Sequence, residues 1–259
     1  MNIQGDALRE YLDRLVVQYE NPAFISQDPI SIPHAYINQA DIEISGLFAA
    51  IFSWGQRTTI INKSKELMGY MGNSPHDFIL HHKERDLKKL LEFKHRTFQA
   101  SDLLYFIRFL KMHYSKHPDL ESAFVKNASF RNVEESLNQF RGYFFSLNDF
   151  PHRTQKHISH PMTGSTCKRL CMYLRWMVRS NQKGVDFGLW KNITPADLFI
   201  PLDVHVQRVS LQLGLLKSQK TNWLTVTELT DRLKAFDSKD PVKYDFALFN
   251  LGIEKMPLL

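Results

Sequence analysis

The sequence predicts an all-α fold. Almost every long segment repeats its apolar residues with the period of an amphipathic helix, and no segment shows the convincing alternation of a half-buried strand. An apolar fraction of 43%, with 19 Phe, is ample for a large core. At 259 residues the chain is long enough for one large domain or two small ones.

Helices account for most of the first half of the chain. Residues 5–20 have the pattern of an amphipathic helix, and a loop with three prolines follows. A long apolar helix follows Asp41 and ends at Gly55, because glycine interrupts helices, and the next helix starts near Thr58. Further helices are predicted over residues 75–82, 84–92, 100–115, 118–127 and 131–147.

The second half resumes the helical pattern after a break. Residues 148–163 are basic and irregular, and they lead into a helix predicted from about Ser165 to Arg179. The next helix begins at Asp203 and is stopped by Gly214. The last two helices are predicted over residues 223–236 and 241–251.

Composition and cysteine content exclude several classes of protein. The chain carries 33 Lys and Arg against 27 Asp and Glu, and the resulting net charge of +6 weakly favours a polyanionic partner. No signal peptide or membrane-spanning run is visible. Cys167 and Cys171 are too few for a four-cysteine zinc or iron–sulfur site, and their spacing along one helix disfavours a disulfide. We therefore expect a soluble cytoplasmic protein with reduced thiols and no metal or cofactor.

The segment "TGSTCKRLCMYLRWMVRS" combines a glycine turn with a cationic helix face. On a helical wheel Arg175 and Arg179 fall within about 20° of Lys168, opposite a face of apolar residues. Residues 164–166 stand at the N-terminal end of this helix, where free backbone N–H groups and the helix dipole favour a phosphate. The alternative interpretation is an ordinary solvated polar face.

A single carboxylate, Asp203, stands among proline and aliphatic residues in "IPLDVHVQRV". It could be a helix N-cap, a member of a structural ion pair, or a catalytic acid. No HExxH, CxxC, GxSxG or P-loop pattern competes with it. Chemistry would then come from a small set such as one amine and one carboxylate. An unprotonated Lys168 amine could attack a sugar carbon while Asp203 takes a proton.

Both segments resemble the helix-hairpin-helix DNA glycosylases. "IPLDVHVQRVSLQLGLL" is similar to the string that carries the catalytic aspartate of that superfamily, and its 8-oxoguanine glycosylases come closest. "GSTCKRL" resembles the hairpin in which a glycine precedes the Schiff-base lysine by four residues, as Gly164 precedes Lys168. This sequence departs from the pattern in having Thr166 where the second hairpin glycine belongs. Lys168 and Asp203 are also 35 positions apart, and the longer connection resembles that of the archaeal 8-oxoguanine glycosylases.

Two further segments extend the resemblance over roughly residues 41–252. "GLFAAIFSWGQRTTIINKSKELM" resembles the early helix–turn–helix of the superfamily, with Gln56 as a glutamine that lies near the DNA. "DPVKYDFALFNLG" resembles the late helix that closes the base pocket. The iron–sulfur cysteines of the endonuclease III branch are missing, which points to the branches without a cluster. The whole chain also resembles a bacterial family of hypothetical proteins.

The resemblance implies an architecture, a partner and a set of roles. It implies two helical subdomains with a helix-hairpin-helix-like element and a cleft between them: residues 40–163 form a central helical barrel, and residues 1–39 with 164–259 form the second subdomain. The partner is double-stranded DNA with a damaged, 8-oxoguanine-like purine; no membrane is involved, and a monomer is expected. The implied catalytic residues are Lys168 and Asp203. The implied DNA-binding residues are Gln56, Arg57, Gly164, Ser165, Thr166, Arg175 and Arg179, and the base-pocket candidates are Trp54, His205, Phe246 and Phe249.

Two functions follow from these patterns. The first is a DNA N-glycosylase or glycosylase/AP lyase, in which Lys168 forms a Schiff base and Asp203 activates it. The second keeps the fold without the catalysis, as a nucleic-acid-binding protein. Replacing Lys168 by Gln separates them: a lyase loses strand cleavage, whereas a binding protein loses only one phosphate contact. A purely structural helical protein is the remaining and least favoured reading.

Overall fold

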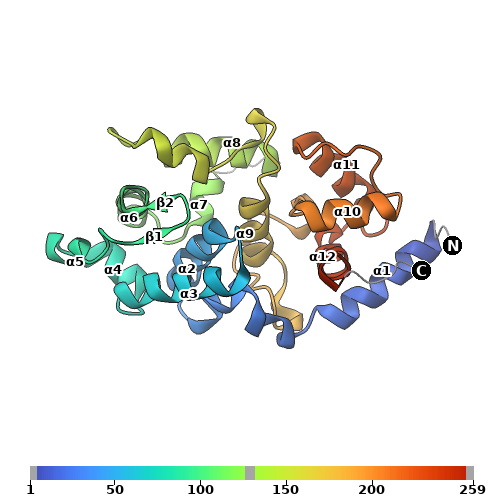
Figure 1. The fold of residues 1–259 in the computed structure, drawn as a ribbon, viewed down its shortest axis with the longest axis horizontal. Coiled ribbons are helices and arrows are strands. Elements are labelled where there is room, and N and C mark those ends of the chain that lie inside the picture. Colours follow the sequence, from blue (N-terminus) through green and yellow to red (C-terminus); the bar gives the residue numbers. More distant parts are fainter. Residues whose placement is uncertain (1–4, 126–131, 255–259) are drawn as a thin grey trace. The chain divides into compact units, whose positions relative to one another are not determined.

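The computed structural model describes residues 5–125 and 132–254, and these residues are predominantly helical (Figure 1). The all-α class is confirmed. The described residues also contain two strands, β1 (Lys94–His95) and β2 (Phe98–Gln99), which pair antiparallel. A strand of two residues is too short to show the alternation by which strands are recognised in a sequence.

The chain divides into two compact units. One comprises residues 25–131 and 135–159, and we call it the Phe-rich unit. The other comprises residues 1–24, 132–134 and 160–259, and we call it the Lys168 unit. The two main changes of unit follow residues 24 and 159, and residues 132–134 make a brief return to the Lys168 unit; the sequence predicted boundaries after residues 39 and 163.

The Phe-rich unit is built around α2 (Gln39–Phe52), which is buried on nearly all sides. A helix that is apolar all round belongs in the middle of a domain. Accordingly α3 (Arg57–Tyr70) and α4 (Pro75–His81) both pack against it (Figure 1). The remaining α-helices of this unit are α5 (Glu84–Lys88), α6 (Ala100–Tyr114), α7 (Glu121–Phe124) and most of α8 (Val133–Phe144).

Phenylalanine rings fill the interior of this unit. The centroids of Phe106 and Phe144 are 4.7 Å apart, and those of Phe52 and Phe98 are 5.1 Å apart. Such aromatic pairs add about 0.5–1.5 kcal/mol each beyond the burial of their area. Phe98 belongs to β2 and is fully buried, so the small hairpin contributes an aromatic ring to the core.

The described part of the Lys168 unit contains five α-helices, apart from the first residues of α8. They are α1 (Asp6–Tyr19), α9 (Lys168–Val178), α10 (Val204–Gln212), α11 (Trp223–Lys234) and α12 (Asp245–Glu254). Helix α12 packs against both α1 and α10. It approaches α10 closely at Gly252, where an added Cβ would lie 2.8 Å from the Cβ of His205. Only glycine fits this crossing without movement of a neighbour.

The start of α9 differs from its prediction. The helix begins at Lys168 instead of Ser165, because Gly164 (φ 74°) and Cys167 (φ 50°) both adopt left-handed backbone conformations. The segment before the turn is a 3-10 helix, η5 (Pro161–Thr163), so the first limb of the predicted hairpin element is a single turn and not an α-helix. The Trp223 N–H donates to the Gly164 carbonyl at 3.0 Å, which fixes the turn to α11.

Short 3-10 helices make up much of the remaining chain. They are η1 (Pro22–Gln27), η2 (Pro29–Ser31), η3 (Pro33–Ala35), η4 (His152–His157), η6 (Asn181–Lys183), η7 (Pro195–Asp197) and η8 (Pro241–Tyr244). The predicted helix over 84–92 is shortened to α5. None of the helices among the described residues is both long enough and apolar enough to span a lipid bilayer.

Candidate functional site

Lys168 is the first residue of α9 and is half-buried. Its amine makes no hydrogen bond or ion pair with any residue that the structure describes. A cation at a helix N-terminus meets the positive end of the helix dipole, which is the unfavourable end for it. The helix dipole therefore does not favour a cation at the position of Lys168.

Asp203 is the N-cap of α10, which confirms one of the three interpretations of its motif. Its Oδ1 accepts hydrogen bonds from the backbone N–H groups of His205, at 2.8 Å, and of Val206, at 3.0 Å. Its Oδ2 accepts no hydrogen bond from any described residue. The cap fixes the direction of the carboxylate and leaves one oxygen available.

Asp245 brings these two residues into a common electrostatic environment. It is the first residue of α12 and is 6% exposed. Burial, opposed by Arg175 and Lys168 and reinforced by the negative charge of Asp203, raises the pKa of the Asp245 carboxyl to about 6. The fields of Lys168 and Asp203 therefore act on the same buried carboxyl. These three residues stand at the N-terminal ends of α9, α10 and α12, and we call them the Lys168 cluster (Lys168, Asp203, Asp245).

The two arginines on the predicted cationic face are not available to a ligand. Arg175 and Arg179 are each only 4% exposed, so the expectation of a solvated stripe is wrong. The Arg175 guanidinium donates to Asp245, and it lies 4.5 Å above the ring of Phe246. A wheel drawn from α9 alone shows which residues share a face, and the neighbouring elements decide whether that face is exposed.

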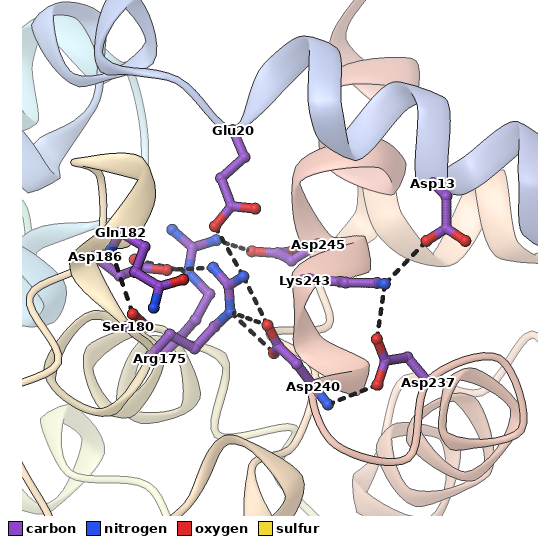
Figure 2. Close-up of polar contacts among 11 residues, drawn as sticks. Asp13, Glu20, Arg175, Ser180, Gln182, Asp186, Asp237, Asp240, Lys243 and Asp245 are labelled. Carbon is purple, nitrogen blue, oxygen red and sulfur yellow. Dashed lines mark hydrogen bonds and ion pairs between the residues drawn. The ribbon is translucent and has the colours of Figure 1, made fainter.

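Carboxylates surround both guanidiniums (Figure 2). Arg179 contacts Asp240 through Nε, at 3.0 Å, and through Nη2, at 2.8 Å, and it lies 2.8 Å from Glu20. Asp186 lies between the two arginines, 2.5 Å from Arg179 Nη1 and 3.5 Å from Arg175 Nε. These ion pairs raise the pKa of Arg179 further above its usual range, despite burial. We call this set the arginine network (Glu20, Arg175, Arg179, Asp186, Asp240), and it adjoins the Lys168 cluster through Asp245.

A second set of ion pairs stabilises the same region (Figure 2). Lys243 Nζ lies 3.0 Å from Asp13 and 2.8 Å from Asp237. These contacts raise the pKa of Lys243 despite burial, and they join α1 and the segment after α11 to η8. The N-terminal segment is therefore attached at two points, through Asp13 to Lys243 and through Glu20 to Arg179.

The aromatic base-pocket candidates of this unit have different environments. Phe246 is 1% exposed and lies beneath both guanidiniums, so the structure contradicts its proposed role in stacking on a base. Phe249 and His205 are half-buried and contact each other edge to face, with centroids 6.5 Å apart. His205 follows the Asp203 cap by two residues, which leaves this pair beside the Lys168 cluster.

The turn before α9 remains accessible. Gly164 is exposed, and Ser165 and Thr166 are half-buried. The Ser165 hydroxyl accepts a hydrogen bond from the Cys167 N–H at 3.2 Å. The left-handed residue next to the helix is Cys167 and not Thr166, so the missing second glycine does not distort the backbone at position 166. Both cysteines are buried free thiols.

The remaining candidates belong to the Phe-rich unit. Gln56 is exposed and precedes α3 directly, and Arg57 is half-buried at the first position of that helix. Trp54 is half-buried, and the Arg96 guanidinium lies 4.9 Å from its ring centroid. One side of the Trp54 ring therefore already has a cationic partner.

Sequence reasoning missed Asp245 and Asp186. Asp245 opens a helix amid apolar residues in "KYDFALF", which is the signal that drew attention to Asp203. Asp186 stands in a loop, and nothing around it in "KGVDFGLW" indicates that it is buried. Among the described residues, no group of three His, Cys, Asp or Glu side chains is arranged to hold a metal ion.

Comparison with known proteins identifies a family without assigning a reaction. Residues 28–254 match a family described as a protein of unknown function (DUF2400). Neither the curated proteins nor the solved structures contain a significant match. Because the match covers most of its length, the chain belongs to the DUF2400 family.

Proposed function

We propose that this member of the DUF2400 family is a DNA glycosylase or glycosylase/lyase. Its substrate is a damaged purine, of the 8-oxoguanine kind, turned out of duplex DNA. Lys168 is the nucleophile and Asp203 is the activating carboxylate. The enzyme acts as a monomer in the cytoplasm, where its two thiols stay reduced.

One observation carries this proposal: Lys168 and Asp203 both act electrostatically on Asp245. Residues 35 positions apart in the sequence thereby share one environment, as a two-residue mechanism requires. Perturbed carboxyls are concentrated at functional sites, and a pKa of about 6 gives Asp245 a charge that changes near neutral pH. The lack of a partner for Lys168 among the described residues adds support, since a structural lysine gains from an ion pair.

The chemistry uses one amine and one carboxylate. The lone pair of neutral Lys168 Nζ forms a bond to C1′ as the bond from C1′ to the base nitrogen breaks. The bonding electrons leave with the base, which takes up a proton. Asp203 stabilises the positive charge that develops at C1′ and accepts the proton that the new ammonium releases. The C1′–O4′ bond then opens, O4′ gains a proton, and a Schiff base remains on Lys168.

Phosphate contacts are assigned to the turn before α9. Gly164 is exposed, and the first backbone N–H groups of α9 are a suitable site for an anion. Arg175 and Arg179 have no part in this contact, because their charges are already used by buried carboxylates. If Lys168, Arg175 and Arg179 all bound phosphates, DNA affinity would fall steeply with salt concentration. Because the two arginines do not, we expect a shallower salt dependence.

Borohydride trapping tests the proposal. Duplex oligonucleotides containing 8-oxoguanine or an abasic site are incubated with the full chain, and borohydride reduces any Schiff base to a stable adduct. We expect an adduct with the wild type. The variants Lys168→Gln and Asp203→Asn should lower its yield by at least about 100-fold, the usual size of the loss when a positioned acid–base group is removed.

A matched control separates loss of the amine from loss of charge. Lys183→Gln removes the same charge from an exposed turn of the same unit, and we expect it to trap as the wild type does. Absence of any adduct, with duplex binding intact, would contradict the lyase and favour the nucleic-acid-binding alternative. Equal trapping by Lys168→Gln and the wild type would mean that another amine is the nucleophile.

A further inference from the structure

Asp186 is the only carboxylate among the described residues that contacts both buried guanidiniums. Its side chain is fully buried, with one oxygen toward Arg175 Nε and the other toward Arg179 Nη1. Arg175 is thus held between Asp186 on its Nε edge and Asp245 at Nη1, with the ring of Phe246 against its plane. The contact with Asp186 is an ion pair at 3.5 Å without a hydrogen bond, whereas Asp245 accepts a hydrogen bond from Nη1.

Asp240 provides an internal comparison. It also binds Arg179, through Nε and Nη2, but no contact joins it to Arg175 among the described residues. Asp186 and Asp240 therefore share one arginine partner and differ in the other (Figure 2). Of these two carboxylates, only Asp186 contacts Arg175, the arginine that donates a hydrogen bond to Asp245.

We propose that Asp186 is a positioning residue that acts through Arg175 on the carboxyl of Asp245, and through Asp245 on the Lys168–Asp203 pair. The second part of this inference rests on the proposed function. The first part concerns the titration of Asp245 and stands without any activity.

The physical basis is that two carboxylates compete for one guanidinium. The Asp186 carboxylate lies against both guanidiniums. It therefore neutralises part of the Arg175 charge that Asp245 would otherwise receive. Without Asp186, Arg175 would favour the ionised form of Asp245 more strongly. Asp245 would then become ionised at a lower pH than in the wild type, and its charge would act on the Lys168–Asp203 pair from that lower pH upward.

The charged groups that act on Asp245 come from several elements. Arg175 and Lys168 on α9 favour its ionised form, and Asp203 at the start of α10 opposes it. The Cys171 thiol, also on α9, is close enough for Asp245 to contribute to its raised pKa, and burial is the main cause of that rise. Glu20 and Asp240 reach this region only through Arg179.

The test follows the Asp245 carboxyl directly. Carbon-13 NMR of protein labelled at aspartate gives the titration midpoint, and Asp245→Asn identifies the resonance. We expect Asp186→Asn to lower the midpoint by about one pH unit, the lower end of the effect of a neighbouring opposite charge. The matched control Asp240→Asn should leave it unchanged. Equal shifts in both variants, or no shift in Asp186→Asn, would overturn the proposal.

A second variant covers the case in which Asp186→Asn does not fold. In Arg175→Lys the charge is kept, but a single ammonium replaces a planar group that contacts two carboxylates. The midpoint of Asp245 should then rise, and an unchanged midpoint would overturn the role of Arg175.

Trapping separates this inference from the proposed function. The pH profile of adduct formation in Asp186→Asn should move in parallel with the NMR midpoint. A moved midpoint with no adduct at any pH would refute the glycosylase and leave the Asp186–Asp245 coupling intact. If Asp186→Asn forms adducts with the same pH profile as the wild type, the coupling to the Lys168–Asp203 pair is refuted.

Discussion

Lys168 is the first residue of α9 and Arg179 directly follows its last, and both lie on the same face of the helical wheel. Their charges differ in burial and in ion pairing. Arg179 is 4% exposed and contacts Glu20, Asp186 and Asp240. Lys168, three turns earlier, is half-buried and has no ion-pair partner among the described residues. One cation contributes to the fold of its unit, and the other is left available at a helix end that disfavours it.

This difference separates a charge that the fold uses from a charge that remains available to a ligand. A buried cation whose donors are all directed at carboxylates cannot also bind a phosphate, because that would leave the carboxylates buried without a counterion. A cation without an ion-pair partner can bind a ligand without leaving a buried carboxylate unpaired. Asp245 lies at the junction, since it contacts Arg175 on one side and experiences the field of Lys168 and Asp203 on the other.

The largest expected effect is on stability, at Arg179. Arg179→Gln leaves three carboxylates without their main counterion, which should cost about 3–5 kcal/mol in the free energy of unfolding. Lys168→Gln, and Arg232→Gln at an exposed position on α11, should each change it by less than about 0.5 kcal/mol. Urea unfolding measures all three. A cost at Lys168 as large as that at Arg179 would remove the distinction between the two cations.

The next effect is pH-dependent and concerns Asp245. Its pKa in the folded protein is raised from 3.8 to about 6, so the folded state holds a proton that the unfolded state releases. Stability from this group is therefore fully present below pH 3.8 and is lost as the pH rises through 6. At about 1.4 kcal/mol for each pKa unit, the loss approaches 3 kcal/mol.

The variant Asp245→Asn removes this titration. The difference in unfolding free energy between wild type and Asp245→Asn should change by about 2–3 kcal/mol between pH 4 and pH 7. The wild type should become less stable relative to the variant as the pH rises. Asp237→Asn is a suitable control, because interactions with Lys243 and nearby backbone N–H groups lower the pKa of Asp237 and give a dependence of opposite sign. A difference that is flat with pH would show that folding does not raise the pKa of Asp245.

The smallest effect separates the two roles of Asp203. Asp203→Ala removes the N-cap of α10 and should cost about 1 kcal/mol, whereas Asp203→Asn keeps a capping oxygen and should be nearly neutral. Asn222→Ala removes the equivalent cap of α11, where the side chain accepts from the Thr225 N–H at 3.1 Å. We expect Asn222→Ala to destabilise as Asp203→Ala does without reducing trapping. Unimpaired trapping in Asp203→Asn would leave Asp203 as a cap alone.

Most of the helices could be predicted from sequence because they depend on local patterns. The apolar run of α2 and the glycine after it predict a central buried helix. Asp203 stands before a segment with helical periodicity, and this position predicts that it is the N-cap of α10. The start of α9 could not be predicted, because Cys167 is a non-glycine residue in a left-handed conformation. The strands at Phe98 escaped detection because two residues cannot display a period.

The sequence by itself determined the all-α class, most of the helix positions and the two residues, Lys168 and Asp203, on which a reaction could depend. Tertiary structure alone decided which charges are available. Arg175 and Arg179 share a helical face with Lys168, but they are covered by Glu20, which follows α1, by Asp245 on α12, and by the loops around residues 186 and 240. Burial and pairing depend on contacts between segments distant in the chain, and a helical period carries no information about those contacts.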